Sequence, residues 1–183
     1  GIAKNIYDFA YSKGLYIIDT TCPKVKSLQK KIEEHVKSHN VIIIGNENHP
    51  EVKSYIAISD KVSIYKKGMN IYDYSYICNQ TTLVYDEIID IHKEILNTNP
   101  NVYIEEEICT ATKERQFALK DAIERCDCII VVGDKLSNNC NSLVSLGKDN
   151  HVDSYLVENI DDLKNTMDEN GLGEIATIFV RYY

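Results

Sequence analysis

The feature that most constrains the fold of this chain is a repeated alternation of short apolar runs, polar loops and helical stretches. The clearest β-branched runs are Val41–Ile44, Cys128–Val132 and Asp153–Val157, and each is followed by a polar segment. The longest helical pattern carries its apolar stripe at Val84, Ile88, Ile91 and Ile95. Because strands that alternate with helices are typical of βαβ units, we predict an α/β protein of repeated strand–loop–helix units with small parallel sheets.

Weaker sequence patterns predict further strands and helices along the chain. Further strands are expected at Leu15–Asp19, Tyr74–Ile77 and Val102–Ile104. Further helices are expected over residues 1–12, after Pro23, up to about Arg125 and from about Asp161. The acidic link Glu105–Glu107 is a plausible boundary between two α/β units, although a solvated turn has the same composition.

The composition narrows the classes of function. A formal net charge of −8 argues against a nucleic-acid or anionic-membrane surface, because such partners select clustered Lys and Arg. No apolar run in the sequence approaches the roughly 20 residues that span a bilayer, and no secretory signal is visible. We therefore expect a cytoplasmic protein without nucleic-acid or membrane partners.

Candidate site residues gather at one predicted edge of the sheets. In open parallel sheets, ligands bind beyond the carboxyl ends of the strands, where loops meet helix N-termini. That rule selects a single set of residues: Cys22, His49, Glu51, Gln80, Thr81, Thr82, Cys109, Thr112, Ser137, Asn139 and Asn141. The coincidence of so many polar or metal-competent side chains predicts a shared site.

Two of the six cysteines occupy chemically distinctive positions. Cys22 precedes Pro23, and proline favours the first helical position, so Cys22 is expected to cap a helix. A thiol there faces the positive end of the helix dipole, which favours the thiolate. Cys109 follows a strand in the same way. Metal ligation, core packing and a catalytic thiol all remain open for these two residues.

The remaining clusters of polar residues can be explained by local structure as well as by function. His49 and Glu51 share a loop in which an imidazole can bind an anion and a carboxylate can transfer protons, although such a pair is often a surface turn. The segments 80–82 and 137–141 are rich in hydroxyl and amide groups at helix starts. Such residues cap helices, and their loops also form phosphate cradles that need few cations.

At these same loops the sequence resembles the IspH/LytB family, the 4-hydroxy-3-methylbut-2-enyl diphosphate reductases. The matching segments follow the family's order and roughly its spacing: LYIIDTTCPKV, IIIGNENHPEV, NQTTL, EEEICTATKERQ and VVGDKLSNNCNSL. They cover about residues 14 to 160. One such segment would mean little, whereas several in order are specific.

The resemblance implies a catalytic centre built around a [4Fe–4S] cluster. In the family, three cysteines hold the cluster and one iron is left open for substrate, which makes Cys22 and Cys109 the second and third ligands here. His49 would contact the substrate diphosphate. Glu51 would deliver the proton during loss of the hydroxyl group, and Thr81 would lie beside that hydroxyl.

The resemblance also implies a substrate and a reaction. Ser137, Asn138 and Asn139 would hold the diphosphate, with Asn138 in place of an expected serine. The reaction is a two-electron reductive dehydroxylation that gives isopentenyl and dimethylallyl diphosphate in the non-mevalonate isoprenoid pathway. The electrons would come from a ferredoxin- or flavodoxin-type donor, so the implied class is an oxidoreductase.

The family has three α/β domains, and the expected division of this chain follows from that. Residues 1–21 would be the tail of a first domain, 22–105 a second domain and 106–183 an incomplete third. The helical pattern at the start lacks a preceding strand, and the apolar tail 173–183 lacks a following helix. Truncation at both ends is therefore expected, with one cluster cysteine missing.

Two other hypotheses remain open at this point. The chain could be a catalytically inactive remnant that binds a diphosphate or a protein partner without a stable cluster. It could also be a hydrolase with Cys22 or Cys109 as nucleophile and His49 as base, although no third group to orient the base is visible.

Overall fold

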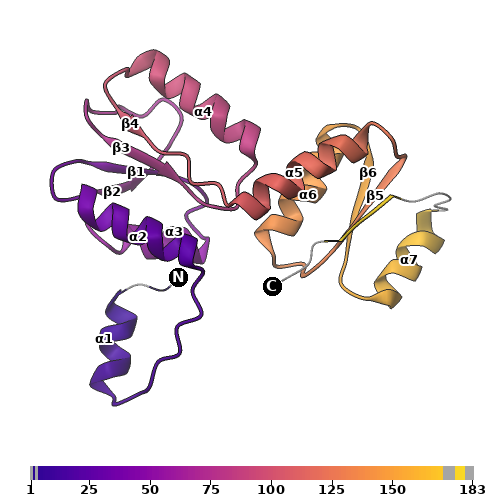
Figure 1. Cartoon of the computed structure of the whole chain (residues 1–183), viewed down its shortest axis with the longest axis horizontal. Helices are drawn as coiled ribbons and strands as arrows, with labels where there is room; N and C mark the ends of the chain where they lie inside the picture. The colour runs from indigo at the N-terminus through magenta and orange to yellow at the C-terminus, as the bar shows by residue number, and fades with distance from the viewer. Residues whose placement is uncertain (1, 3, 171–175, 180–183) are drawn as a thin grey trace. The chain divides into compact units, whose positions relative to one another are not determined.

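The computed structural model describes residues 2, 4–170 and 176–179, and the chain forms two compact units (Figure 1). Unit 1 consists of Gly1–Thr81 and Asp86–Ile108, and unit 2 of Thr82–Tyr85 and Cys109–Tyr183. Each unit contains a small parallel sheet with helices packed on it. The predicted α/β class is therefore confirmed, whereas the expected division into parts of three domains stays a prediction.

Unit 1 is built on a four-stranded sheet in the order β2-β1-β3-β4. Every neighbouring pair is parallel. The strands are β1 (Val41–Ile44), β2 (Val62–Ile64), β3 (Tyr76–Asn79) and β4 (Tyr103–Ile104). All residues of β1 and β3 are buried, which explains why these two strands read as continuous apolar runs rather than as alternating ones.

Helices cover both faces of this sheet (Figure 1). Helices α2 (Pro23–His35) and α3 (Pro50–Ile56) pack their buried apolar side chains against Val41, Ile43 and Cys78. Because side chains alternate along a strand, Ile42 and Ile44 face the opposite side, where α4 (Tyr85–Thr98) lies with its buried isoleucines. The carboxyl ends of β1 and β3 lead directly into the loops that carry the predicted site residues.

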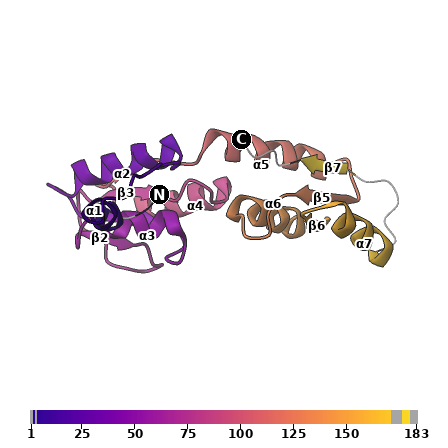
Figure 2. The ribbon, with the colours of Figure 1, turned by 90° about the horizontal axis from the view of Figure 1, so that it is seen from below.

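Unit 2 repeats this plan around a three-stranded parallel sheet in the order β6-β5-β7. The strands are β5 (Cys128–Val132), β6 (Asp153–Val157) and β7 (Ala176–Phe179). Helices α5 (Thr110–Ile123) and α6 (Asn138–Asp149) share one apolar cluster with β5, and α7 (Ile160–Asn170) packs on the other face (Figure 2). Most element positions agree with the sequence-based expectations.

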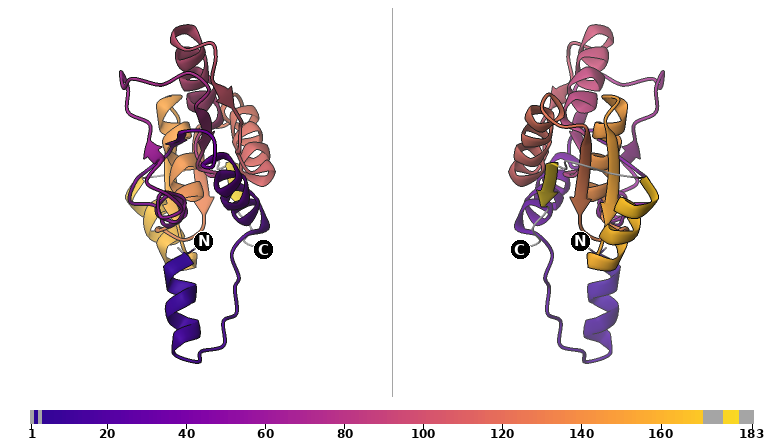
Figure 3. Two further views of the ribbon diagram at one scale, coloured as in Figure 1. Left: turned by 90° about the vertical axis from the view of Figure 1, so that its left-hand side faces the viewer. Right: turned by 90° about the vertical axis from the view of Figure 1, so that its right-hand side faces the viewer.

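The segment Leu15–Asp19 is a clear exception, because the strand predicted there is wrong. It runs without regular structure between α1 (Lys4–Ser12) and α2 (Figure 3). Its apolar side chains are exposed, with Tyr16 91% and Ile18 78% accessible. A β-branched run forms a strand only where a neighbouring strand accepts its backbone hydrogen bonds, and no strand pairs with it among the described residues.

Other differences concern short elements. Helix α3 and strand β2 were not predicted, because each is too short to show a clear period. The expected helix over residues 1–12 is confirmed as α1, with residues 1 and 3 outside the described part. Of the apolar tail 173–183, only β7 is described, and residues 171–175 and 180–183 lie outside the described residues.

Gly45 is required where β1 meets α3. A Cβ atom at this position would lie 2.8 Å from the side chain of Val52 and 3.0 Å from that of Gln80. The first distance is shorter than real Cβ contacts and the second is tighter than nearly all of them, so any side chain at position 45 would force Val52 and Gln80 to move. The backbone of α3 and the residue before Thr81 are thereby brought against the end of β1.

The helices of the described residues include no candidate for a membrane-spanning segment, since none combines sufficient length with sufficient apolar character.

Candidate active site

The predicted site residues at the starts of four helices occupy N-cap positions. Cys22 caps α2, His49 caps α3, Cys109 caps α5 and Ser137 caps α6. Each has a negative φ and a ψ between 118° and 135°, the extended conformation that precedes a helix. The unpaired N–H groups of each first helical turn therefore lie beside a residue selected from the sequence alone.

These four N-cap residues differ in whether the side chain accepts a hydrogen bond from the first turn of the helix. His49 Nδ1 accepts a hydrogen bond of 3.3 Å from the Glu51 backbone N–H, and Ser137 Oγ accepts one of 3.4 Å from Cys140. Neither cysteine makes a side-chain cap bond. Cys22 is exposed and Cys109 is half-buried, so both thiols remain accessible to a ligand outside the helix.

Glu51, the predicted catalytic residue, is nearly enclosed, with 4% of its surface accessible. Its Oε1 accepts hydrogen bonds of 2.8 Å from the Thr81 backbone N–H and from the Tyr55 hydroxyl. Its Oε2 accepts one of 3.0 Å from Thr81 Oγ1. A buried carboxylate is tolerated only when donors surround it, and here three donors do so.

Thr81 is held in register by the sheet itself. Gln80 N donates to Ile44 O at 2.8 Å, which continues the β1–β3 ladder by one residue. The side chain of Gln80 accepts from Asn46 N at 3.1 Å and fixes the loop after β1. Thr81 therefore reaches Glu51 because two adjacent strand ends are locked together.

The start of α3 is tied to α2 by a short polar chain. Gln29 Nε2 donates to Ser54 Oγ at 3.0 Å, and Ser54 Oγ donates to the Glu51 carbonyl at 2.6 Å. Because Glu51 and Ser54 belong to one helical turn, this chain fixes the backbone from which the carboxylate projects. Glu51, Thr81 and His49 are thus brought together within unit 1.

The imidazole of His49 lies next to this carboxylate. Burial lowers the pKa of His49 below its usual value, and the negative charge of Glu51 opposes that shift. The neutral imidazole offers one donor and one acceptor, and Nδ1 is the acceptor that caps α3. Its other ring nitrogen is left as the donor, which suits an anionic ligand.

In unit 2 the predicted diphosphate residues are consecutive at the start of α6. Asn138 Nδ2 donates to the Thr82 carbonyl at 3.0 Å and contacts Thr82 Oγ1 at 3.1 Å. The side chain of Asn138 therefore fastens the 82–85 segment to α6. Asn139 Oδ1 is buried and has no hydrogen-bond partner among the described residues, and as an acceptor it would be satisfied by a donor rather than by an anion.

An ionic cluster around the buried Glu107 lies between α2 and the end of β4. The Glu107 side chain is 1% accessible, and its two oxygens each lie 2.5 Å from a lysine nitrogen, Lys24 and Lys31 respectively. Lys31 also pairs with Glu105, which accepts a hydrogen bond of 2.6 Å from the Tyr76 hydroxyl. This cluster connects the turn that follows Cys22 with the segment that leads to Cys109.

A comparison with known protein families settles the membership of the chain. Residues 1–179 match the family model described as LytB protein. The chain belongs to the LytB family. A relative from Wolbachia pipientis wMel, named 4-hydroxy-3-methylbut-2-enyl diphosphate reductase, is 35% identical over 171 residues, which are 87% of this chain and 55% of that protein.

Other LytB relatives give the same picture. A protein of the same name from Francisella philomiragia is 33% identical over 93% of this chain and 58% of its own length. A solved structure of the E-1-hydroxy-2-methyl-but-2-enyl-4-diphosphate reductase from Plasmodium falciparum has a TM-score of 0.87 at 28% identity, covering 98% of this chain and 58% of that one. The chain thus spans little more than half the length of the relatives it matches.

The described residues contain no assembled metal site, although two cysteines have the chemistry of metal ligands. No group of three or more His, Cys, Asp or Glu side chains suited to a metal occurs among residues 2, 4–170 and 176–179. Cys22 and Cys109 fit as donors, because each thiol is accessible and makes no cap bond. Cys78 and Cys128 are buried in the two cores and belong to packing instead.

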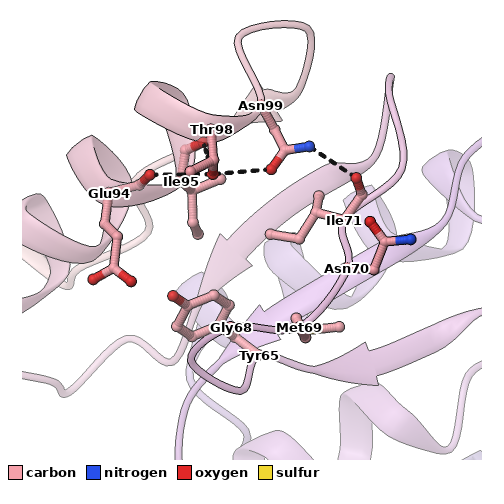
Figure 4. A pocket seen from close by; sticks show the side chains of 9 residues that line it. All are labelled: Tyr65, Gly68, Met69, Asn70, Ile71, Glu94, Ile95, Thr98 and Asn99. Carbon is pink, nitrogen blue, oxygen red and sulfur yellow. Dashed lines mark hydrogen bonds between the residues drawn. The ribbon is translucent and has the colours of Figure 1, made fainter.

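A separate hollow in unit 1 contains none of the predicted site residues (Figure 4). Its volume is about 440 Å³, and it lies between α4 and the segment that follows β2. Several of its polar groups bond to one another, as in the 2.9 Å contact from Asn99 Nδ2 to the Ile71 carbonyl.

Sequence reasoning missed two contributors to the site. Tyr55 donates to Glu51, and Glu107 anchors the segment before Cys109. The spacing of four between Glu51 and Tyr55 would have indicated a contact had α3 been predicted. Glu107 carried no such signal, because an acidic run reads as a solvated link.

Proposed function

We propose that this chain carries the reducing site of a 4-hydroxy-3-methylbut-2-enyl diphosphate reductase, an oxidoreductase of isoprenoid biosynthesis acting in the cytoplasm. The observation that carries the proposal is the buried contact of Glu51 with both the N–H and the hydroxyl of Thr81. A carboxylate enclosed with a hydroxyl partner is suited to proton transfer at an alcohol. Membership of the LytB family supports the substrate.

The proposed reaction removes the substrate hydroxyl group. The C–O bond breaks, two electrons and two protons are taken up, and water and a mixture of isopentenyl and dimethylallyl diphosphate are released. Glu51 delivers the proton that converts the leaving hydroxyl to water, and the Thr81 hydroxyl orients that group. The electrons come from a ferredoxin- or flavodoxin-type donor.

We propose that Cys22 and Cys109 are ligands of a [4Fe–4S] cluster. When bound, such a cluster supplies electron transfer and a Lewis-acidic iron. The N-cap positions support this assignment, because the first-turn N–H groups stabilise negative charge near each sulfur. Whether the two thiols face one cavity stays a prediction.

We assign binding of the diphosphate to uncharged side chains and to backbone N–H groups that can donate hydrogen bonds. His49 offers its free ring nitrogen, and Ser137, Asn138 and Asn139 stand at the start of α6, where backbone N–H groups attract anions. For Asn139 the donor to phosphate would be a nitrogen, of the side-chain amide or of the backbone, because an amide oxygen only accepts hydrogen bonds. Asn138 can contribute its backbone, since its side chain is engaged with Thr82.

Anaerobic reconstitution of the chain with iron and sulfide tests the cluster. Bound iron and visible absorption are expected to fall in Cys22→Ser and in Cys109→Ser, because each substitution removes a thiolate. Cys126→Ser is the matched control, since Cys126 is also incompletely buried but precedes β5. We expect the absorption to be short-lived, and a small added thiol to prolong it. Equal loading of all variants would contradict the ligand assignment.

Turnover tests the proton role separately. Glu51→Gln is expected to keep the iron content and lose at least about 100-fold in kcat, because an amide cannot deliver the proton. Normal turnover would remove Glu51 from this role. Binding of inorganic pyrophosphate without any iron loading would favour the alternative, an inactive remnant that retains only the anion site.

A further inference from the structure

The surroundings of the Glu51 carboxylate include a residue to which neither the family motifs nor the reaction assigns a role. Tyr55 lies on α3 four positions after Glu51, and residues four apart share one face of a helix. Its hydroxyl donates a hydrogen bond of 2.8 Å to Glu51 Oε1. The side chain is fully buried in the core of unit 1, so water does not compete for this bond.

The two oxygens of Glu51 are occupied unequally. Oε1 accepts two hydrogen bonds, from the Tyr55 hydroxyl and from the Thr81 N–H. Oε2 accepts one, from Thr81 Oγ1. Because a carboxylate oxygen has two lone-pair directions, these contacts fill Oε1 and leave one direction open on Oε2. The open direction lies on the oxygen that touches the threonine hydroxyl.

Tyr55 can act only as a donor in this arrangement. Burial raises the pKa of its phenol, and the negative charge of Glu51 raises it further. Cys78 on β3 and Glu107 after β4 are the other ionisable groups that act on the phenol, and both also raise its pKa. The hydroxyl therefore keeps its proton and points that proton at Oε1.

We propose that Tyr55 is the positioning residue of Glu51: it occupies Oε1 and so reserves Oε2, beside the Thr81 hydroxyl, as the oxygen that carries the proton. The role of that proton rests on the proposed function, whereas the orientation of the carboxylate does not. The ring is held in place by the packed apolar layer between α2, α3 and the sheet. Rotation of the carboxylate would break all three of its hydrogen bonds.

Infrared difference spectroscopy on the whole chain, without cluster or substrate, tests the orientation. Spectra of the chain and of Glu51→Gln identify the Glu51 carboxylate bands, whose frequencies depend on hydrogen bonding. Tyr55→Phe is expected to shift the antisymmetric band. Tyr76→Phe is the matched control, because this buried tyrosine donates to a different carboxylate, that of Glu105, and it should leave the Glu51 band unchanged.

An unshifted Glu51 band in folded Tyr55→Phe overturns the proposal. If Tyr55→Phe fails to fold by circular dichroism, the reverse experiment replaces it. In a chain labelled with ¹³C at tyrosine Cζ, the isosteric change Glu51→Gln is expected to move the Tyr55 signal and to leave the Tyr76 signal in place. A Tyr55 signal that does not move also overturns the proposal.

Turnover distinguishes this inference from the proposed function. Tyr55→Phe is expected to lower kcat about tenfold and to change KM less than about twofold, because the proton donor is misplaced while diphosphate contacts remain. An unchanged kcat in an active enzyme would refute the positioning role. If the unsubstituted protein shows no turnover but the infrared shift occurs, the proposed function fails and the orientation of Glu51 by Tyr55 stands.

Discussion

Unit 1 buries charged and hydroxyl side chains, whereas the buried polar side chains described in unit 2 are uncharged. Glu51 and Glu107 are nearly inaccessible in unit 1, each with several donors around it. The buried polar residues of unit 2 are Thr112, Gln116 and Ser154. The same strand–loop–helix plan therefore encloses carboxylates in one unit and only uncharged polar side chains, among those described, in the other.

This difference bears on the proposed function, because the two kinds of polar group suit different steps. A buried carboxylate has to be held by fixed donors before the substrate arrives, which suits a group that transfers a proton. Neutral amides and backbone N–H groups at a helix start can bind phosphate without a lysine or arginine. The acidic net charge of the chain is then no obstacle to anion binding.

The largest expected effect tests whether each core supports its own unit. Leu28→Ala in unit 1 and Leu143→Ala in unit 2 each remove a fully buried side chain, and each should lower the free energy of unfolding by about 2–5 kcal/mol. Amide hydrogen exchange should show lost protection in β1 and β3 for the first, and in β5 for the second. Leu136→Ala, at a 91% accessible position, is the control. If either substitution lowered the protection of both sheets equally, the two units would not have independent cores.

The next effect concerns ion pairs of contrasting burial. Glu107→Gln removes a buried charge that faces two lysines, and it should lower the free energy of unfolding by about 1–3 kcal/mol. Glu158→Gln in unit 2 removes an exposed partner of Lys135 at 3.6 Å, and should change it by less than about 0.5 kcal/mol. Denaturant titration measures both. A larger effect at Glu158 would reverse the contrast.

A smaller effect is expected at the start of α6. Asn138→Ala removes two contacts to Thr82 and should cost about 1 kcal/mol, with faster hydrogen exchange in the 82–85 segment. Thr82→Val keeps the carbonyl acceptor and removes only the hydroxyl, so it should cost less. If Thr82→Val is the more damaging change, the side chain of Asn138 does not fasten this segment through the carbonyl.

Acidification should produce the smallest effect: a gradual fall in the free energy of unfolding of unit 1 as the pH is lowered. Burial lowers the pKa of His49 and of His92, and a neighbouring glutamate opposes each shift. The unfolded chain binds these protons more readily, so stability is present above the usual histidine pKa and is lost as pH falls through the lowered values. Urea titrations between about pH 7.5 and 5 measure the slope, and His92→Asn should reduce it. Stability that rises on acidification would contradict this account.

Sequence patterns predicted the main strands and the site loops because both follow from local chemistry. Runs such as Val41–Ile44 are buried on both faces, and Pro23 and Pro50 stand where proline favours a first helical turn. The N-cap at Cys22 could therefore be placed without coordinates, whereas the one at His49 was not, because α3 was not predicted. The roles assigned to those residues stay predictions.

What the sequence could not predict depends on partners distant along the chain. The run Leu15–Asp19 has strand composition but no strand beside it among the described residues. The burial of Glu107 depends on Lys24 and Lys31, more than 70 positions earlier. Tyr55 was missed for a different reason, since the short helix that aligns it with Glu51 is not apparent from periodicity.

The close approach at Gly45 has a consequence for variation at this position. In a saturation library that scores folded protein, we expect every substitution at residue 45 to be depleted, alanine included. Gly14 and Gly68 have open space around the Cβ position and positive φ values, so asparagine should survive there. The tolerance map would thus separate a glycine selected for its missing atom from glycines selected for their backbone angles.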